Sequence, residues 1–105
     1  MKYKIARTIA QILGFEYDYF LHGRKTEEVY FARYITVGIL KEEGFASLEI
    51  MKVFVGRSRG YIDGHAFESF NTLLSNNKKF KNMYLKAVQA VEELDHESEN
   101  DTQSA

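Results

Sequence analysis

The chain has 105 residues, a length that favours one domain with a modest hydrophobic core. It contains no cysteine, which excludes disulfides, thiolate metal sites and thiol nucleophiles and fits a reducing cytoplasm. No apolar run approaches the roughly 18 residues that a membrane-spanning helix needs, so we expect no membrane segment. The N-terminal stretch lacks a long apolar core and a cleavage site, and we interpret it as a first helix, not a signal peptide.

Charge is distributed unevenly along the chain. Residues 1–91 hold all 14 Lys and Arg against nine acidic residues, a net charge of +5, and the other six acidic residues follow. A mildly basic body permits nucleic-acid binding without requiring it. The segment 95–105 is polar, acidic and free of aromatic residues, so we expect it to be a disordered tail.

Helical patterns follow one another along the first half of the chain, and the sequence contains no proline. The first pattern ends at Gly14, a short one covers about 16–22, and a long one runs from an N-cap at Thr26 to about residue 43. The buried stripe expected on the long helix consists of Val29, Ala32, Ile35, Thr36, Ile39 and Leu40.

The second half contains three more patterns, at about 47–55, 58–74 and 78–94. Ser47 is expected to cap the first of them. The residues of that helix expected to face inward are Leu48, Met51 and Val55. The chain as a whole therefore predicts an all-α, six-helix single domain over residues 1–94.

Residues 44–70 contain the most informative pattern, two helices joined by a tight turn at Val55-Gly56. The second helix carries Arg57, Arg59 and Tyr61 at its leading end. Two short helices joined by a Gly-containing turn, with basic and aromatic residues leading the second, are typical of a helix-turn-helix that reads duplex DNA.

Three stretches, in order along the chain, carry a resemblance to a known family. They are IARTIAQILGFEYDYFLHGRK, VYFARYITVGILKEEGFASLEI with an arginine at Arg33, and GRSRGYIDGHA. They resemble, in turn, the opening helices and basic loop, the long helix, and the G-R-D-H-S-T-V-x-H-A signature of the C-terminal DNA-binding domain of DnaA-type bacterial replication initiators. The His-Ala of that signature matches His65-Ala66 after a one-residue shift. The resemblance covers residues 4–94 and implies a Trp-repressor/DnaA C-terminal-domain-like fold.

The resemblance also implies contacts with the DNA backbone and minor groove. Arg24 or Lys25 occupies the place of an arginine that enters the minor groove, where a long cation meets strongly negative potential. Lys41 matches a lysine that contacts phosphate. The alternative for these residues is that they are ordinary solvated cations. The helix start at Ser47 offers free backbone N–H groups to a phosphate.

The signature is altered where the family reads bases. Arg57 is retained and has the chemistry to contact guanine or phosphate, while Ser58-Arg59 and Gly60-Tyr61 replace Asp-His and Ser-Thr. We therefore expect that the usual initiator box is not recognised, and that Arg59 and Tyr61 read another sequence or the reading function is lost. The predicted DNA-binding residues are Arg24, Lys25, Lys41, Ser47, Arg57, Ser58, Arg59, Tyr61 and His65.

No constellation of residues favours an enzyme. The three histidines lack metal-ligand spacing, and no Gly-Lys-Ser/Thr loop is present to cradle a phosphate. We expect no catalytic activity, no cofactor, no metal and no small-molecule substrate.

A cluster of aromatic residues favours a second interpretation. Adjacent helical positions diverge by about 100°, so Tyr30, Phe31 and Tyr34 cannot all face one stripe, and some are expected at the surface or against a partner.

The main prediction is a cytoplasmic, bacterial protein that binds double-stranded DNA and regulates replication or transcription by occupancy alone. The alternative is a degenerate member of the family that acts as a protein–protein interaction module or homodimer.

Overall fold

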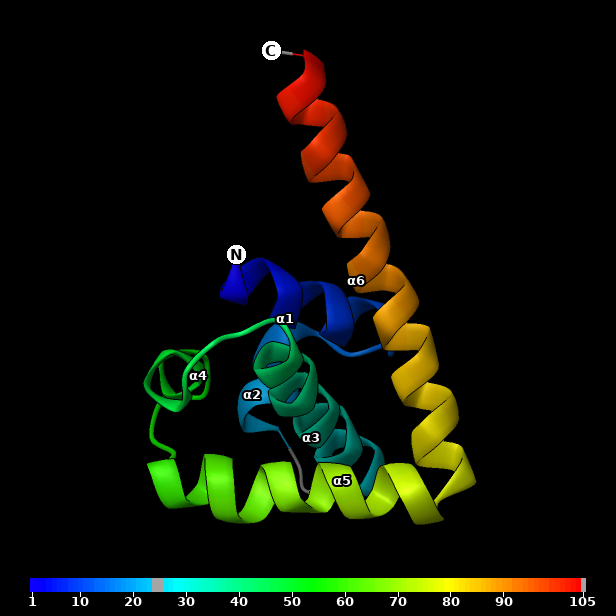
Figure 1. Ribbon diagram of the computed structural model, residues 1–105. Coiled ribbons are helices and arrows are strands. Elements are labelled where there is room, and N and C mark those ends of the chain that lie inside the picture. Colours follow the sequence, from blue (N-terminus) through cyan, green and yellow to red (C-terminus); the bar gives the residue numbers. More distant parts are fainter. Residues whose placement is uncertain (24–25, 105) are drawn as a thin grey trace.

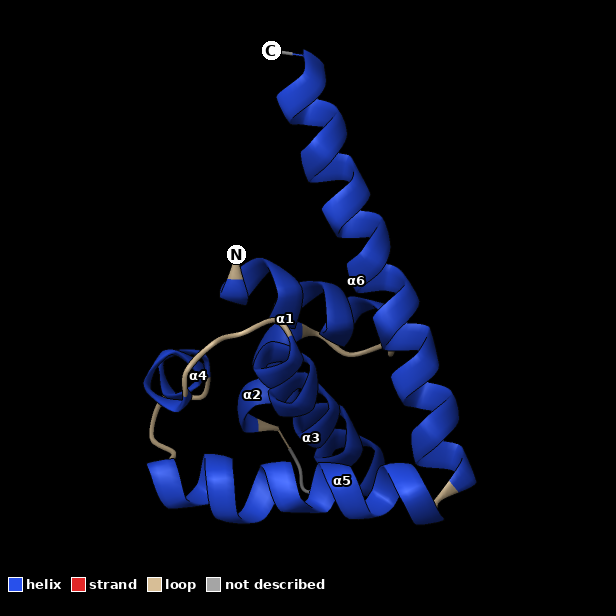
Figure 2. Ribbon diagram, in the orientation of Figure 1, coloured by secondary structure: helices blue, strands red, loops and turns tan. Residues whose placement is uncertain are grey.

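The structure, a computed structural model, describes residues 1–23 and 26–104, with side chains described as far as Leu94. This part of the chain is helical, without a strand, which confirms the all-α prediction (Figure 2). The elements are α1 (Lys2–Ile12), α2 (Tyr17–His22), α3 (Glu27–Glu42), α4 (Ser47–Val53), the π-helical turn η1 (Tyr61–Ala66), α5 (Phe67–Asn76) and α6 (Lys78–Ser104).

Helix α3 lies at the centre of the molecule. It packs against α1, α2, α4, η1, α5 and α6, and Figure 1 shows α5 crossing beneath it while α6 runs along one side. All six residues of its predicted stripe are buried. Because neighbours surround α3, burial extends beyond that stripe, to Phe31, Arg33, Tyr34, Val37 and Gly38. The helix is therefore buried on several sides along most of its length.

This burial corrects the expectation of surplus aromatic rings at the surface. Phe31 is 6% exposed and Tyr34 is 9% exposed, and the half-buried Tyr30 stacks on Tyr34 with ring centroids 6.2 Å apart. Adjacent positions do diverge around the helix, as the sequence argument holds, but each direction meets another element of the same chain. Phe31 and Tyr34 are therefore part of the core, and Tyr30 packs against it with part of its ring exposed.

Gly38 explains how α5 approaches α3 so closely. The ring of Phe70 lies directly over this glycine, in the space that any Cβ atom would occupy. Phe70 also packs edge-on against Phe80 and Tyr84 of α6. The absence of one side chain on α3 thus lets a single ring from α5 join three helices.

Helix α4 differs from the prediction in its cap and in its buried face. Its N-cap is Ala46, with no side-chain hydrogen bond, so Ser47 is the first helical residue. The side chains that reach the core are Ile50 and Val53. Leu48 and Val55, which were expected to face inward, are 62% and 74% exposed. The helix contacts α1, α3 and η1 along one side only, and that side is offset from the face that the apolar spacing indicated.

The last helix continues beyond the predicted end of the domain. Its inward positions Phe80, Ala87, Val91 and Leu94 are buried, as the pattern predicted. The backbone of α6 is helical to Ser104, whereas a disordered tail was expected over 95–105; the side chains after Leu94 lie outside the described residues.

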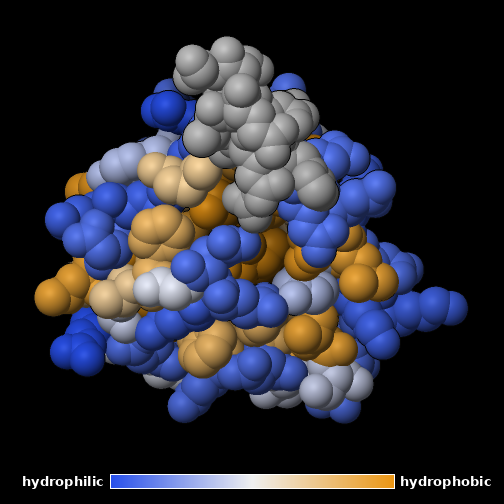
Figure 3. All heavy atoms as spheres, turned by 45° about the horizontal axis from the view of Figure 1, so that its top comes forward, coloured by the Kyte–Doolittle hydropathy of each residue, from blue (hydrophilic) through white to orange (hydrophobic). Residues whose placement is uncertain are grey.

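None of the helices in the described part of the chain is both long and apolar enough to span a membrane. On the face shown in Figure 3, hydrophobic residues are scattered over a largely hydrophilic surface.

Candidate nucleic-acid interface

The connection from α4 to the next helix is held by one buried ring and one cap. Phe54 is 3% exposed and packs edge-on against Phe20, with ring centroids 5.6 Å apart. The chain then reverses at Gly56, whose φ of +92° lies in the left-handed region that favours glycine. The Ser58 Oγ accepts a hydrogen bond from the backbone N–H of Tyr61 at 3.1 Å, an N-cap for the helix that begins at residue 59. Ser58, predicted to contact DNA, is thus a capping residue.

The helix that begins at residue 59 contains the π turn η1 before it continues as α5. A π turn closes i→i+5 hydrogen bonds and holds one residue more than an α-helical turn. Ile62 and Ala66 anchor this turn in the core, both fully buried. His65 faces α3, where its Nε2 lies 3.0 Å from the Tyr34 hydroxyl oxygen. His65, another predicted DNA contact, is exposed, with one ring nitrogen engaged by Tyr34.

Asp63 gathers two of the predicted DNA-binding cations. Its Oδ1 lies 2.7 Å from the Lys41 Nζ and accepts a hydrogen bond from the Ser47 Oγ at 2.6 Å. Its Oδ2 lies 3.3 Å from the Arg59 Nε, and Lys41 also donates to the Ser47 Oγ at 2.8 Å. The hydrogen bond from Lys41 has the largest effect on the pKa of Asp63 and that from Ser47 the next largest; together they lower it to about 2. We call these four residues the Asp63 network; it joins α3, α4 and η1.

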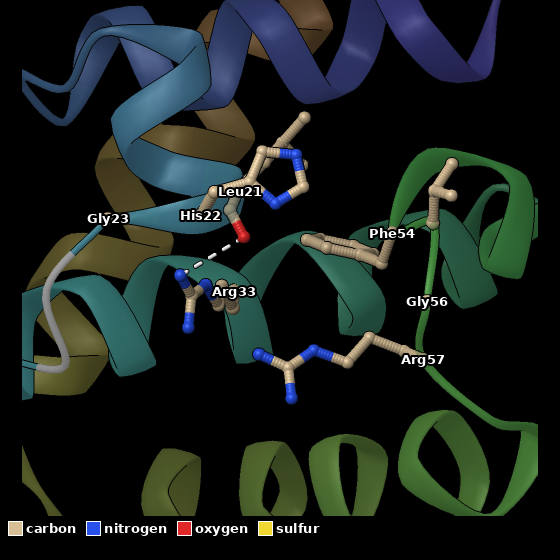
Figure 4. A pocket seen from close by; sticks show the side chains of 8 residues that line it. Leu21, His22, Gly23, Arg33, Phe54, Gly56 and Arg57 are labelled. Carbon is tan, nitrogen blue, oxygen red and sulfur yellow. Dashed lines mark hydrogen bonds between the residues drawn. The ribbon is translucent and has the colours of Figure 1, made fainter.

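A second group of cations surrounds a cavity of about 300 Å³. Figure 4 shows Arg33 of α3 and Arg57 of the α4–η1 connection extending toward the same space. We call it the arginine pocket; its walls are formed by Leu21, His22, Gly23, Arg33, Phe54, Val55, Gly56 and Arg57. None of these lining residues is acidic. The pocket therefore concentrates positive charge that its own walls do not neutralise.

Arg33 is a buried cation that anchors the end of α2. It is 2% exposed, and it donates from Nε to the Phe20 carbonyl oxygen at 2.8 Å and from Nη2 to the Leu21 carbonyl oxygen at 3.2 Å. These carbonyls belong to the last turn of α2, where a cation also complements the helix dipole. Burial lowers the pKa of Arg33, and the positive charge of Arg57 lowers it further, against the opposing effect of Tyr61.

Arg57 faces Arg33 without a carboxylate partner among the residues that the structure describes. Its guanidinium carbon lies 4.8 Å from the centroid of the Tyr61 ring, which fixes its position by a cation–π contact. Tyr61 consequently points inward beneath Arg57, not outward as a base-reading residue would. The Tyr61 hydroxyl is buried and makes no hydrogen bond within the described part of the chain, and burial raises its pKa.

The predicted DNA-binding residues thus fall into distinct environments. Arg57 lines the arginine pocket, while Lys41, Ser47 and Arg59 meet at Asp63. Arg24 and Lys25 lie outside the described residues, although Gly23, which precedes them, lines the pocket.

Two contributors to these sites were missed in the sequence. Asp63 lies four residues after Arg59, a spacing at which charged side chains meet on a helix, and this was an available signal. Arg33 stands within an apolar run, Ala32 to Ile35, where a charge requires buried partners, but the sequence did not identify the carbonyls that bind it.

The comparisons with known proteins provide no relative from which a role follows. No family model, no curated protein and no solved structure matches this chain significantly. Within residues 1–23 and 26–94, no group of three or more His, Cys, Asp or Glu side chains is placed to hold a metal ion.

Proposed function

We propose that this chain binds double-stranded DNA through the surface around the α4–η1 connection. The observation that carries the proposal is the clustering of three cations, Lys41, Arg57 and Arg59, on neighbouring elements whose described contacts include only one carboxylate, Asp63. A basic surface of this kind supplies the sequence-independent part of DNA affinity, because it neutralises phosphates and releases their counterions.

The arrangement of α4 and the helix that follows it supports this proposal. Residues 54–58 connect the two helices, and Gly56 provides the reversal between them. In a helix-turn-helix the leading end of the second helix meets the major groove. Here that end carries Arg57 and Arg59, which are half-buried and exposed, respectively.

The π turn supports the resemblance to DnaA-type initiators. The family signature matches His65-Ala66 only after a shift of one residue, and η1 lies between Tyr61 and Ala66, directly in that interval. Because a π turn accommodates one additional residue, the helix absorbs the shift while Ile62 and Ala66 both stay buried. The chain keeps its packing register on either side of the extra residue.

The contacts expected with DNA are mainly electrostatic. Ser58 caps a helix, Tyr61 lies under Arg57 and His65 binds Tyr34, so three of the predicted readers are already engaged within the protein. Arg57 and Arg59 remain as the side chains that reach phosphates or guanine edges. We infer a regulator that acts by occupying DNA, with a sequence preference different from that of the family.

A titration with duplex DNA tests this function. Fluorescence anisotropy with a pool of random duplexes is expected to show binding that weakens as salt rises, and repeated selection from the pool then reports any sequence preference. Arg57→Glu is expected to weaken binding at least tenfold, whereas Lys86→Glu, the same charge reversal on the exposed side of α6, is expected to have a small effect. Absence of binding at low salt, or equal losses in the two variants, would refute the proposal.

A protein-binding role is a second candidate, and it rests on a different observation from the aromatic rings. Leu48 and Val55 leave large apolar side chains exposed near the two ends of α4. Sedimentation velocity at several concentrations tests self-association through this surface. A concentration-dependent dimer that Leu48→Gln abolishes supports it, and a monomer at every concentration argues against it.

A further inference from the structure

The arginine pocket has a property that duplex binding does not explain. DNA binding needs cations at the surface, yet Arg33 lies 98% buried behind that surface. Removing a guanidinium from water is costly unless partners compensate its charge. The two carbonyls of α2 compensate it in part by accepting from Nε and Nη2. The remaining nitrogen, Nη1, has no hydrogen bond among the residues that the structure describes and keeps a small contact with solvent.

The second cation increases this imbalance. Arg57 extends toward the same cavity (Figure 4). Its guanidinium carbon lies over the Tyr61 ring, 4.8 Å from the ring centroid. Two like charges that face one cavity repel each other, and an anion between them reverses the sign of that interaction. Guanidinium groups match the oxygens of a phosphate in geometry as well as in charge, because each presents a planar fork of N–H donors.

Apolar side chains form part of the remaining wall, beside His22 and two glycines. Phe54 is 97% buried and rigidly packed against Phe20, and the Val55 side chain is exposed beside it. The volume of about 300 Å³ is at the lower end of the range for small-molecule sites. A cavity with two fixed cations on one side and apolar groups on the other suits a compact organic anion.

We propose that the arginine pocket binds a phosphate monoester, with its phosphoryl group between Arg33 and Arg57 and its organic part against Phe54 and Val55. A phosphoryl dianion neutralises the charge of both guanidinium groups. A diester linkage within a DNA strand carries a single negative charge and neutralises only one of them. The ligand is a mononucleotide-sized molecule or the 5′-phosphate at a DNA end, which share this chemistry. The site does not depend on the duplex-binding proposal.

Calorimetric titration of the full chain without DNA tests the site. At about pH 8 a phosphate monoester is a dianion, since its second pKa is about 6. Thymidine 5′-monophosphate and inorganic phosphate are expected to bind at least tenfold more tightly than dimethyl phosphate at the same ionic strength. Equal affinities for the three compounds, or no heat of binding at millimolar concentration, would overturn the proposal.

Variants with matched chemistry locate the binding. Arg57→Gln is expected to weaken mononucleotide binding at least tenfold, and Arg57→Lys, which keeps the charge but loses the fork, less than that. Arg7→Gln is the control, because Arg7 also lies over a tyrosine ring, Tyr17, at 5.0 Å but lines no part of the pocket. Circular dichroism confirms that each variant is folded. Similar losses for Arg7→Gln and Arg57→Gln would show general charge screening and overturn the site.

A comparison of two duplexes distinguishes the two sources of the phosphate. A 5′-phosphorylated duplex that binds more tightly than the same duplex with 5′-hydroxyl ends identifies the DNA terminus as the ligand. Equal affinities of the duplexes, together with mononucleotide binding, identify a small molecule. If neither duplex binds but the mononucleotide does, the duplex-binding function fails and the pocket stands.

Discussion

The Asp63 network and the arginine pocket use the same kinds of residue for different purposes. In the network, Lys41 and Arg59 share one carboxylate at 2.7 and 3.3 Å, so Asp63 offsets one of their two positive charges. In the pocket, Arg33 and Arg57 face one another across a cavity whose walls contain no acid. Both regions use α3. The network adds α4 and the helix that begins at residue 59, whereas the pocket adds the end of α2 and the connection after α4.

This difference shows that the number of cations on a surface does not by itself predict how tightly the surface binds an anion. A cation that is paired within the protein must exchange its carboxylate for a phosphate, so it contributes only the difference between the two interactions. An unpaired cation contributes its full interaction with the ligand. Arg57 is therefore expected to matter more for binding than Lys41 or Arg59, although the sequence presents all three as equivalent basic residues.

The largest expected effect comes from removing the buried cation of the pocket. Arg33→Met is expected to lower the free energy of unfolding by about 3 kcal/mol, because the Phe20 and Leu21 carbonyls lose their donors while still buried. Urea denaturation measures the change. Arg7→Met, an exposed arginine on α1, is the control and is expected to change stability little. A comparable stability for Arg33→Met and the wild type would show that the pocket does not depend on this anchor.

A pair of matched substitutions compares the two regions directly. Arg57→Gln is expected to weaken duplex binding about tenfold, since it removes an unpaired charge that hydrogen-bonds a phosphate. Arg59→Gln is expected to weaken binding only about threefold, because Asp63 already offsets part of the Arg59 charge and must be exchanged for a phosphate. Anisotropy titrations at a fixed salt concentration give both values. The reverse order would mean that pairing in the free protein does not limit Arg59.

Removal of the Asp63 carboxylate is expected to leave the cations of the network unpaired, like those of the pocket. Asp63→Asn leaves Lys41 and Arg59 without their ion pair, and it is expected to cost about 1 kcal/mol of stability. The same change is expected to strengthen duplex binding about threefold, because both cations become available to phosphate. Denaturation and anisotropy measure the two effects. Glu68→Gln, on the exposed part of α5, serves as a control for the change in net charge; an affinity that falls in Asp63→Asn would contradict the comparison.

The smallest expected effect is a dependence of stability on acid. Lys41 and Ser47 lower the pKa of Asp63 from 3.8 to about 2 on folding, so the folded state favours the ionised form. Its contribution to stability is therefore present above about pH 4 and is lost as the pH falls toward 2. Since other carboxylates titrate in the same range, the measurement is the difference in stability between wild type and Asp63→Asn. That difference is expected to shrink over this interval, and a constant difference would show that ionisation of Asp63 does not stabilise the network.

The buried face of a long helix was predicted more accurately than that of a short one. The stripe from Val29 to Leu40 was confirmed because a long central helix keeps its apolar positions in phase over several turns. Helix α4 has seven residues, and over so short a length the apolar pattern fits more than one face. Leu48 and Val55 were therefore assigned to the interior, whereas Ile50 and Val53 occupy it. The π turn gave no signal in residue spacing other than the shifted match at His65.

The sequence by itself determined that the chain is helical, that its body is basic, and that the residues around Gly56 change direction. These properties depend on neighbouring residues and on the spacing of apolar side chains, which are read directly along the chain. Only the tertiary structure decided which cations have partners. Lys41, Ser47 and Asp63, like Arg33 and Arg57, come from separate elements, and charge pairing depends on distances of a few ångströms that helix packing sets. Helix packing therefore placed Lys41 and Arg59 in a structural network, and Arg33 and Arg57 at an open cationic pocket.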